Sequence, residues 1–206
     1  NASREMVKES AIYERERTVN LGILPYMFSK IAVLGAFALF QSAAILFIVN
    51  AFEPFAQGIF LPVLLEMYIP LALSAVAGVL MGLLLSAIVP DEDSVSSFLP
   101  LIIIVQVILS GAIIPLKDWF TMIMATIAPT RWAAVALGSS LGLHSDKIDG
   151  GKLFGNDPTY HGTLFSIYNQ ADATQHLLLA WIALGVIMLV LTFAIGLSLK
   201  RKDIRK

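Results

Sequence analysis

The sequence contains no cysteine among its 206 residues, and it carries few charges. The absence of cysteine excludes disulfide bonds, thiolate metal sites and a cysteine nucleophile. Charged residues make up 14% of the chain, whereas an average soluble domain has about 25%. The net charge of −1 gives no indication of a nucleic-acid partner. The composition therefore argues against a nucleic-acid-binding protein and against a large soluble domain.

Motifs of the common catalytic and metal sites are also missing. No phosphate-binding loop, no Gly-x-Ser-x-Gly and no His-Glu-x-x-His is present. The three histidines, His144, His161 and His176, are 17 and 15 residues apart, so no helix or turn brings them together. We therefore expect no catalytic residues and no metal site in this chain.

Long apolar runs take the place of these features. Hydrophobic residues account for 57% of the chain, and the mean hydropathy is +0.79. Crossing a bilayer takes about 20 apolar helical residues, and such a run must satisfy its backbone internally. Four runs are long enough: residues 31–49, 59–89, 98–116 and 177–199. The sequence predicts an all-α polytopic membrane protein with four transmembrane helices.

A fifth apolar stretch, residues 119–143, is interrupted at Pro129, Thr130 and Arg131. Its two halves are each too short to span a bilayer, so we expect a re-entrant or interfacial pair followed by an external loop. Lysine and arginine favour the cytoplasmic side of a membrane. Five of the fourteen lie in residues 4–30 and five in residues 200–206. Both termini are therefore expected to be cytoplasmic, which agrees with four spans.

This organisation divides the chain into four parts. Residues 1–30 form a cytoplasmic helix and interfacial segment, and residues 31–116 hold three transmembrane helices. Residues 117–176 hold the re-entrant helices and the external loop, and residues 177–206 hold the last transmembrane helix and its basic tail.

Two features inside the second run have alternative interpretations. Glu66 is the only acid within a long apolar run, so it is either part of a transport path or a capped residue near the outer interface. Gly78, Gly82 and Ser86 form a ridge of small residues at four-residue spacing. Such a ridge favours close helix packing over ligand binding.

Three segments carry a resemblance to a known family. Residues 4–30 read REMVKESAIYERERTVNLGILPYMFSK, with the order Glu9, Tyr13, Arg15, Glu16 ahead of a span. Near the end of the third run, residues 109–116 read LSGAIIPL and include Ser110 and Gly111. Further on, residues 129–132 read PTRW. Together, in this order, they resemble the C-terminal portion of the membrane domain of ABC-2 type exporters of the G-subfamily kind.

The resemblance implies a dimer of two half-transporters, identical or different, with the substrate path between them and ATP-driven closure of an ATPase domain. ATP and Mg²⁺ would bind that ATPase domain, and no cofactor is expected in this chain. The first segment would be the coupling helix, and its contact residues with the ATPase domain would be Glu9, Tyr13, Arg15, Glu16 and Arg17. The substrate pathway would include Gln41, Ile104 and Val107, with Ala112 and Ile113 as a plug.

Two other functions remain as alternatives. A membrane anchor or interaction protein would have the same spans but would bind no ATPase domain. A membrane-embedded enzyme needs polar groups that converge inside the spans, and only Glu66, Gln41, Gln106 and scattered hydroxyls are available. The compact loops lead us to expect an exporter of a bacterial plasma membrane, whose substrate the sequence does not identify.

Overall fold

The computed structural model describes residues 2–8, 22–55, 61–89, 91–111, 119–140 and 170–204. Within these ranges the secondary structure is helical and contains no strand. The helices are α1 (Ala2–Lys8), α3 (Ile23–Phe52), α4 (Val63–Ile88), α5 (Glu92–Leu109), α6 (Trp119–Thr126), α7 (Pro129–Ser140) and α8 (Gln170–Ile204). The all-α prediction is confirmed for the described part of the chain.

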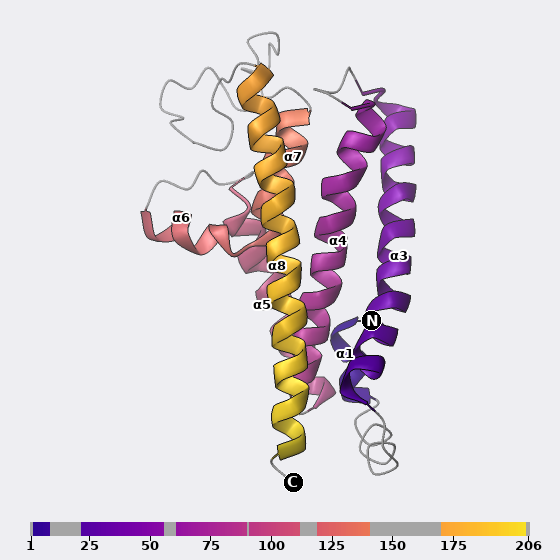
Figure 1. The fold of residues 1–206 in the computed structure, drawn as a ribbon, viewed down its shortest axis with the longest axis vertical. Helices are drawn as coiled ribbons and strands as arrows, with labels where there is room; N and C mark the ends of the chain where they lie inside the picture. Colours follow the sequence, from indigo (N-terminus) through magenta and orange to yellow (C-terminus); the bar gives the residue numbers. More distant parts are fainter. Residues whose placement is uncertain are drawn as a thin grey trace.

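Three of these helices are long and apolar enough to cross a membrane: Leu24–Phe52, Val63–Ile88 and Thr174–Arg201. They correspond to three of the four predicted runs and lie side by side in Figure 1. α4 is the central helix, because it packs against both α3 and α8. Apolar side chains from α1, α3, α4 and α8 meet in one buried cluster: Met6, Met27, Leu80, Leu83, Ala87, Ile195 and Leu199.

The third predicted run, residues 98–116, differs from the helix that forms. α5 begins at Glu92 and ends at Leu109, so it is displaced toward the N-terminus. Gly111 has a φ of 71°, which ends a helix in the left-handed conformation that glycine adopts most readily. At about 1.5 Å per residue, the 18 residues of α5 extend about 27 Å.

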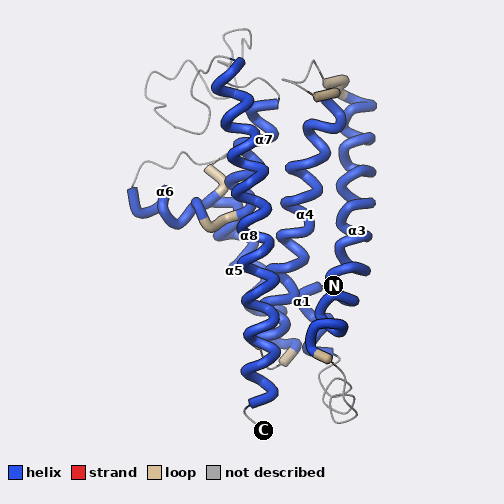
Figure 2. Tube along the Cα trace, in the orientation of Figure 1, coloured by secondary structure: helices blue, strands red, loops and turns tan. Residues whose placement is uncertain are grey.

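The interrupted stretch folds into two helices at a sharp angle. α6 and α7 are bent by 92° relative to each other at the break before Pro129. Figure 2 shows α6 running away from the bundle while α7 lies along it. α7 packs against α8 through a second buried cluster of Val135, Ala136, Leu177 and Ala180.

Both ends of the described chain point toward one end of the bundle. α1 lies near the end of the bundle at which α8 finishes (Figure 1). We call this end of the bundle the α1 end. Lys200 and Arg201, the last residues of α8 with described side chains, are exposed there. The start of α4 lies at the opposite end.

Candidate functional site

α1 is seated on the small-residue ridge of α4. Gly82 allows this approach, because a Cβ atom added there would lie 3.1 Å from the Ala2 Cβ and 3.1 Å from the Ser3 nitrogen. One turn further, the buried Ser86 Oγ accepts hydrogen bonds from the backbone N–H groups of Met6 and Val7, both at 3.0 Å. At Gly82 and Ser86 the predicted ridge is therefore a packing surface for α1, whereas a Cβ atom added at Gly78 would have no described neighbour within 4 Å outside its own helix backbone.

Polar side chains connect α1 to two further helices. The Glu5 carboxylate pairs with Lys30 of α3 at 3.1 Å, and both side chains are partly buried. The Lys30 ammonium also lies 5.9 Å from the centre of the Tyr26 ring. On the other side, Arg4 donates to the Ser96 hydroxyl of α5 at 2.7 Å. α1 thus holds α3, α4 and α5 together at the α1 end.

The predicted coupling residues directly follow this helix. Glu9, Tyr13, Arg15, Glu16 and Arg17 all lie outside the described residues. The sequence argument did not identify Arg4, Glu5 and Ser86 as the residues that attach α1. The four-residue spacing of Gly82 and Ser86 was the available signal, but it does not reveal which segment the ridge receives.

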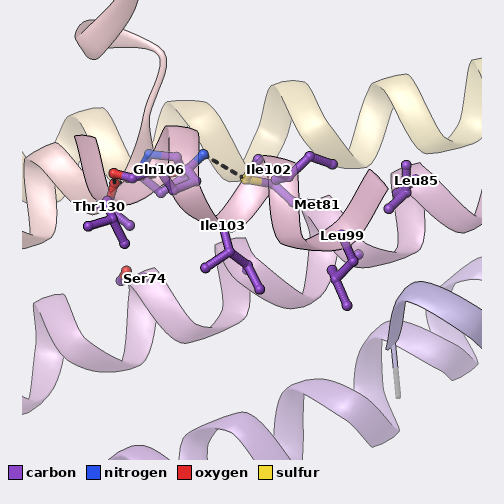
Figure 3. Close-up of a pocket in the computed structure, with 12 residues that line it drawn as sticks. Ser74, Met81, Leu85, Leu99, Ile102, Ile103, Gln106 and Thr130 are labelled. Carbon is purple, nitrogen blue, oxygen red and sulfur yellow. Dashed lines mark hydrogen bonds between the residues drawn. The ribbon is translucent and has the colours of Figure 1, made fainter. Parts of the chain in front are cut away.

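A cavity of about 250 Å³ lies between α4, α5 and the start of α7. Figure 3 shows its wall, which is apolar apart from Ser74, Gln106 and Thr130. The Thr130 hydroxyl lies 2.7 Å from the Gln106 backbone carbonyl and 2.9 Å from Gln106 Oε1. The Gln106 amide nitrogen donates to Met81 Sδ at 3.3 Å. These contacts attach the first turn of α7 to the last turns of α5.

The corner between α6 and α7 is fixed by a second set of contacts. The Trp132 indole N–H donates to the Thr126 carbonyl at 2.8 Å, across the bend. Pro129 occupies the first position of α7, where its missing N–H leaves no helical hydrogen bond unmade. The predicted PTRW element therefore shapes the corner and connects it to α5.

The predicted pathway residues lie on two different helices. Val107 lines the cavity, whereas Ile104 is 56% exposed on the outer side of α5. Gln41 is exposed on α3, which packs against α4 and α8. Ala112 and Ile113 lie outside the described residues.

Glu66 lies at the beginning of α4 and is completely buried. Its Oε2 atom accepts a hydrogen bond from the Leu61 N–H at 3.1 Å, just before the helix begins. An acid in the first turn also interacts favourably with the helix dipole. This geometry favours the capping interpretation of Glu66 over a place in a transport path.

Comparison with known proteins gives two matches. The sequence profile of the family described as ABC-2 type transporter matches residues 2–141. The chain is 29% identical over 164 residues to the ABC transporter ATP-binding/permease protein Rv1747 of Mycobacterium tuberculosis. That alignment covers 78% of this chain and 19% of the relative, so the chain spans a small part of the relative's length. No solved structure matches.

Proposed function

Because the chain belongs to the ABC-2 type transporter family, we propose that it forms the membrane pathway of an ATP-driven exporter. The name of its mycobacterial relative joins ATP-binding and permease parts in one protein. Membrane domains of this family are not themselves catalytic. ATP, Mg²⁺ and hydrolysis accordingly belong to an ATPase domain outside residues 1–206.

The proposed topology has four spans with both termini in the cytoplasm of a bacterium. α3, α4 and α8 are three of these spans, and α5 is the fourth, with α6 and α7 as the re-entrant pair. The clustering of basic residues in 4–30 and 200–206 supports a cytoplasmic α1 end. The order of the three motifs supports a G-subfamily-like domain that corresponds to the C-terminal portion of a half-transporter.

The attachment of α1 to three helices is the main observation that supports coupling between an ATPase domain and the membrane helices. A movement of the segment after α1 would pass to α4 through Ser86, to α3 through the Glu5–Lys30 pair and to α5 through Arg4. Packed helices with two alternative arrangements form a two-state equilibrium. Nucleotide binding shifts such an equilibrium when it favours one of the two arrangements. In this proposal Glu9, Tyr13, Arg15, Glu16 and Arg17 contact the ATPase domain.

The exposed side of α5 supports a second half-transporter as partner. Leu101, Ile104, Val105 and Ile108 recur at helical spacing, and each is more than 40% exposed. Gln41 is a polar side chain on an apolar, exposed helix, where contact with protein or a polar path is more favourable than contact with lipid. We propose that the path lies between two such domains, with Ile104, Val107 and Gln41 in its wall and Ala112 and Ile113 at its plug.

A labelling experiment tests the coupling. The full-length transporter is placed in lipid nanodiscs with Ile104→Cys as reporter, since residues 1–206 contain no other cysteine. We expect ATP with vanadate to change the rate of maleimide labelling several-fold. Glu9→Ala/Glu16→Ala should remove that change while ATP hydrolysis continues. Glu53→Ala replaces an exposed acid at the opposite end of α3 and should leave the change intact.

Two outcomes contradict the proposal. If nucleotide leaves the labelling rate unaltered in the unmodified background, the chain does not respond to an ATPase domain and the membrane-anchor alternative is favoured. If the double variant responds like the Glu53→Ala control, the segment after α1 is not the coupling contact. Oxidative cross-linking of the same cysteine between two copies separately tests the dimer.

A further inference from the structure

The cavity between α4, α5 and α7 has a property that packing does not account for. Gly78 lines it, and no described atom outside its own helix backbone lies within 4 Å of a Cβ added at this position. Glycine inside a helix is unfavourable relative to alanine, and here no close helix contact compensates for it. Gly82, one turn away, is different, because its missing side chain makes room for α1. The effect of Gly78 is open volume in the cavity.

The polar groups of the cavity gather toward one of its ends. In Figure 3, Ser74, Gln106 and Thr130 lie toward one end, and Leu85 and Leu99 toward the other. The amide nitrogen of Gln106 has two hydrogens, and its only acceptor among the described residues is the Met81 thioether, a weak one. The Ser74 hydroxyl makes no hydrogen bond to any described residue. Donors and acceptors for a ligand are thus available at one end of an apolar space.

We propose that this cavity binds a small neutral amphiphile, with its single hydroxyl or carbonyl at Gln106 and Ser74 and its aliphatic body toward Leu85 and Leu99. The described lining contains no charged side chain, so an ionic ligand would lose its hydration without a counter-ion. Apolar cavities of about 150 Å³ accept benzene, so a volume of about 250 Å³ suits roughly ten non-hydrogen atoms. The proposal does not depend on ATP-driven transport.

The site would connect three structural parts. Ser74, Gly78 and Met81 belong to α4, Gln106 belongs to α5, and Thr130 begins α7. An occupant would therefore contact the central helix, the shorter helix and the bent pair at once. The cavity lies between α5 and α4, whereas the proposed substrate path runs along the outer side of α5 between two domains, and Val107 borders both.

Photolabelling tests the site. The full-length protein in nanodiscs is irradiated with an octanol that carries a diazirine, and adducts are located by mass spectrometry. We expect adducts on cavity residues between 74 and 107, reduced at least fivefold by excess 1-decanol. Gly78→Leu, which fills the open volume, should reduce them to a similar extent. Gly185→Leu is the matched control, because Gly185 on α8 also has open space around its Cβ position but lies outside the cavity.

Gln106→Leu separates the polar contact from the space itself. This variant should lower labelling by the octanol probe severalfold but leave labelling by a diazirine-bearing octane unchanged. The proposal is overturned if Gly78→Leu and Gly185→Leu label alike, or if the octane labels the unmodified cavity as strongly as the octanol does. Adducts distributed over exposed apolar residues outside the cavity, such as Leu189 of α8, in proportion to exposure would indicate partitioning into the bilayer only. A gel-filtration profile identical to that of the unmodified protein verifies that each variant is folded.

Discussion

The hydroxyl oxygen of Ser86 lies 3.0 Å from the backbone nitrogen of Met6, although the two residues are 80 positions apart. The same oxygen accepts the N–H of Val7, so a single side chain of α4 holds two backbone groups of α1. The contact is buried, which excludes water as a replacement acceptor. Ser86 therefore attaches α1 to α4 through two hydrogen bonds from one side chain.

Replacing Ser86 by alanine should release α1. Two N–H groups of α1 lose their acceptor on α4, and a typical hydrogen bond contributes about 0.5–1.5 kcal/mol net. We expect hydrogen–deuterium exchange in residues 2–8 to accelerate about tenfold or more, while exchange in α4 stays slow. Ser42→Ala is the control, because among the described residues the buried Ser42 hydroxyl bonds only to Ala38 of its own helix. Equal exchange in the two variants would show that Ser86 does not hold α1.

The Glu5–Lys30 pair should contribute less than Ser86. The two side chains are 33% and 18% exposed, so solvent and salt weaken their attraction. Partly exposed pairs are typically worth up to about 1 kcal/mol. A double-mutant cycle of Glu5→Gln and Lys30→Gln, measured by thermal unfolding in detergent, should give a coupling of that order that decreases at high salt. A coupling insensitive to salt would contradict the electrostatic explanation.

Hydropathy predicted three helices of the bundle correctly, because a membrane helix depends on a run of apolar residues within one segment of the sequence. α3, α4 and α8 each contain a run of apolar residues longer than the bilayer core is thick, and such a run has few alternatives to a membrane helix. The predicted end of the third run, at residue 116, lies beyond Leu109, where α5 ends. The sequence remains apolar beyond Leu109, but the backbone turns at Gly111, and hydropathy carries no information on φ.

The contacts around α1 could be predicted only in part. The spacing of Gly82 and Ser86 predicted a surface for close packing, and that surface exists. The partner of this surface is α1, a seven-residue helix that is too short for hydropathy to predict. Its contacts with α4 join residues 80 positions apart, and a single sequence contains no periodicity that reveals such contacts. The cavity was missed as well, because Gly78, Gln106 and Thr130 come together only through the α5–α7 corner.

The end of α5 provides a further test. Gly111 has a φ of 71°, a conformation that costs residues with a Cβ atom about 1–2 kcal/mol. Gly111→Ala should therefore destabilise the fold by about 1 kcal/mol, and Gly111→Asn should cost less, since asparagine tolerates this region better. Thermal unfolding of the three proteins in the same detergent gives the ranking. Alanine and asparagine variants of equal stability would argue against a left-handed helix end at this position.

Two glycines of α4, one turn apart, should respond oppositely to the same substitution. At Gly82 an added methyl would lie 3.1 Å from both the Ala2 Cβ and the Ser3 nitrogen, so α1 must move away. At Gly78 the methyl meets no described atom within 4 Å outside its own helix backbone, and alanine favours a helix over glycine by about 0.5–1 kcal/mol. We expect Gly78→Ala to raise the unfolding temperature, and Gly82→Ala to lower it and to accelerate hydrogen exchange in residues 2–8. Both residues are glycines of the same helix, so the intrinsic helix propensities cancel in the comparison. The remaining difference in unfolding temperature measures the contact between α1 and Gly82. If both substitutions stabilise the protein equally, α1 does not rest on Gly82, and the attachment through Ser86 must be reconsidered with it.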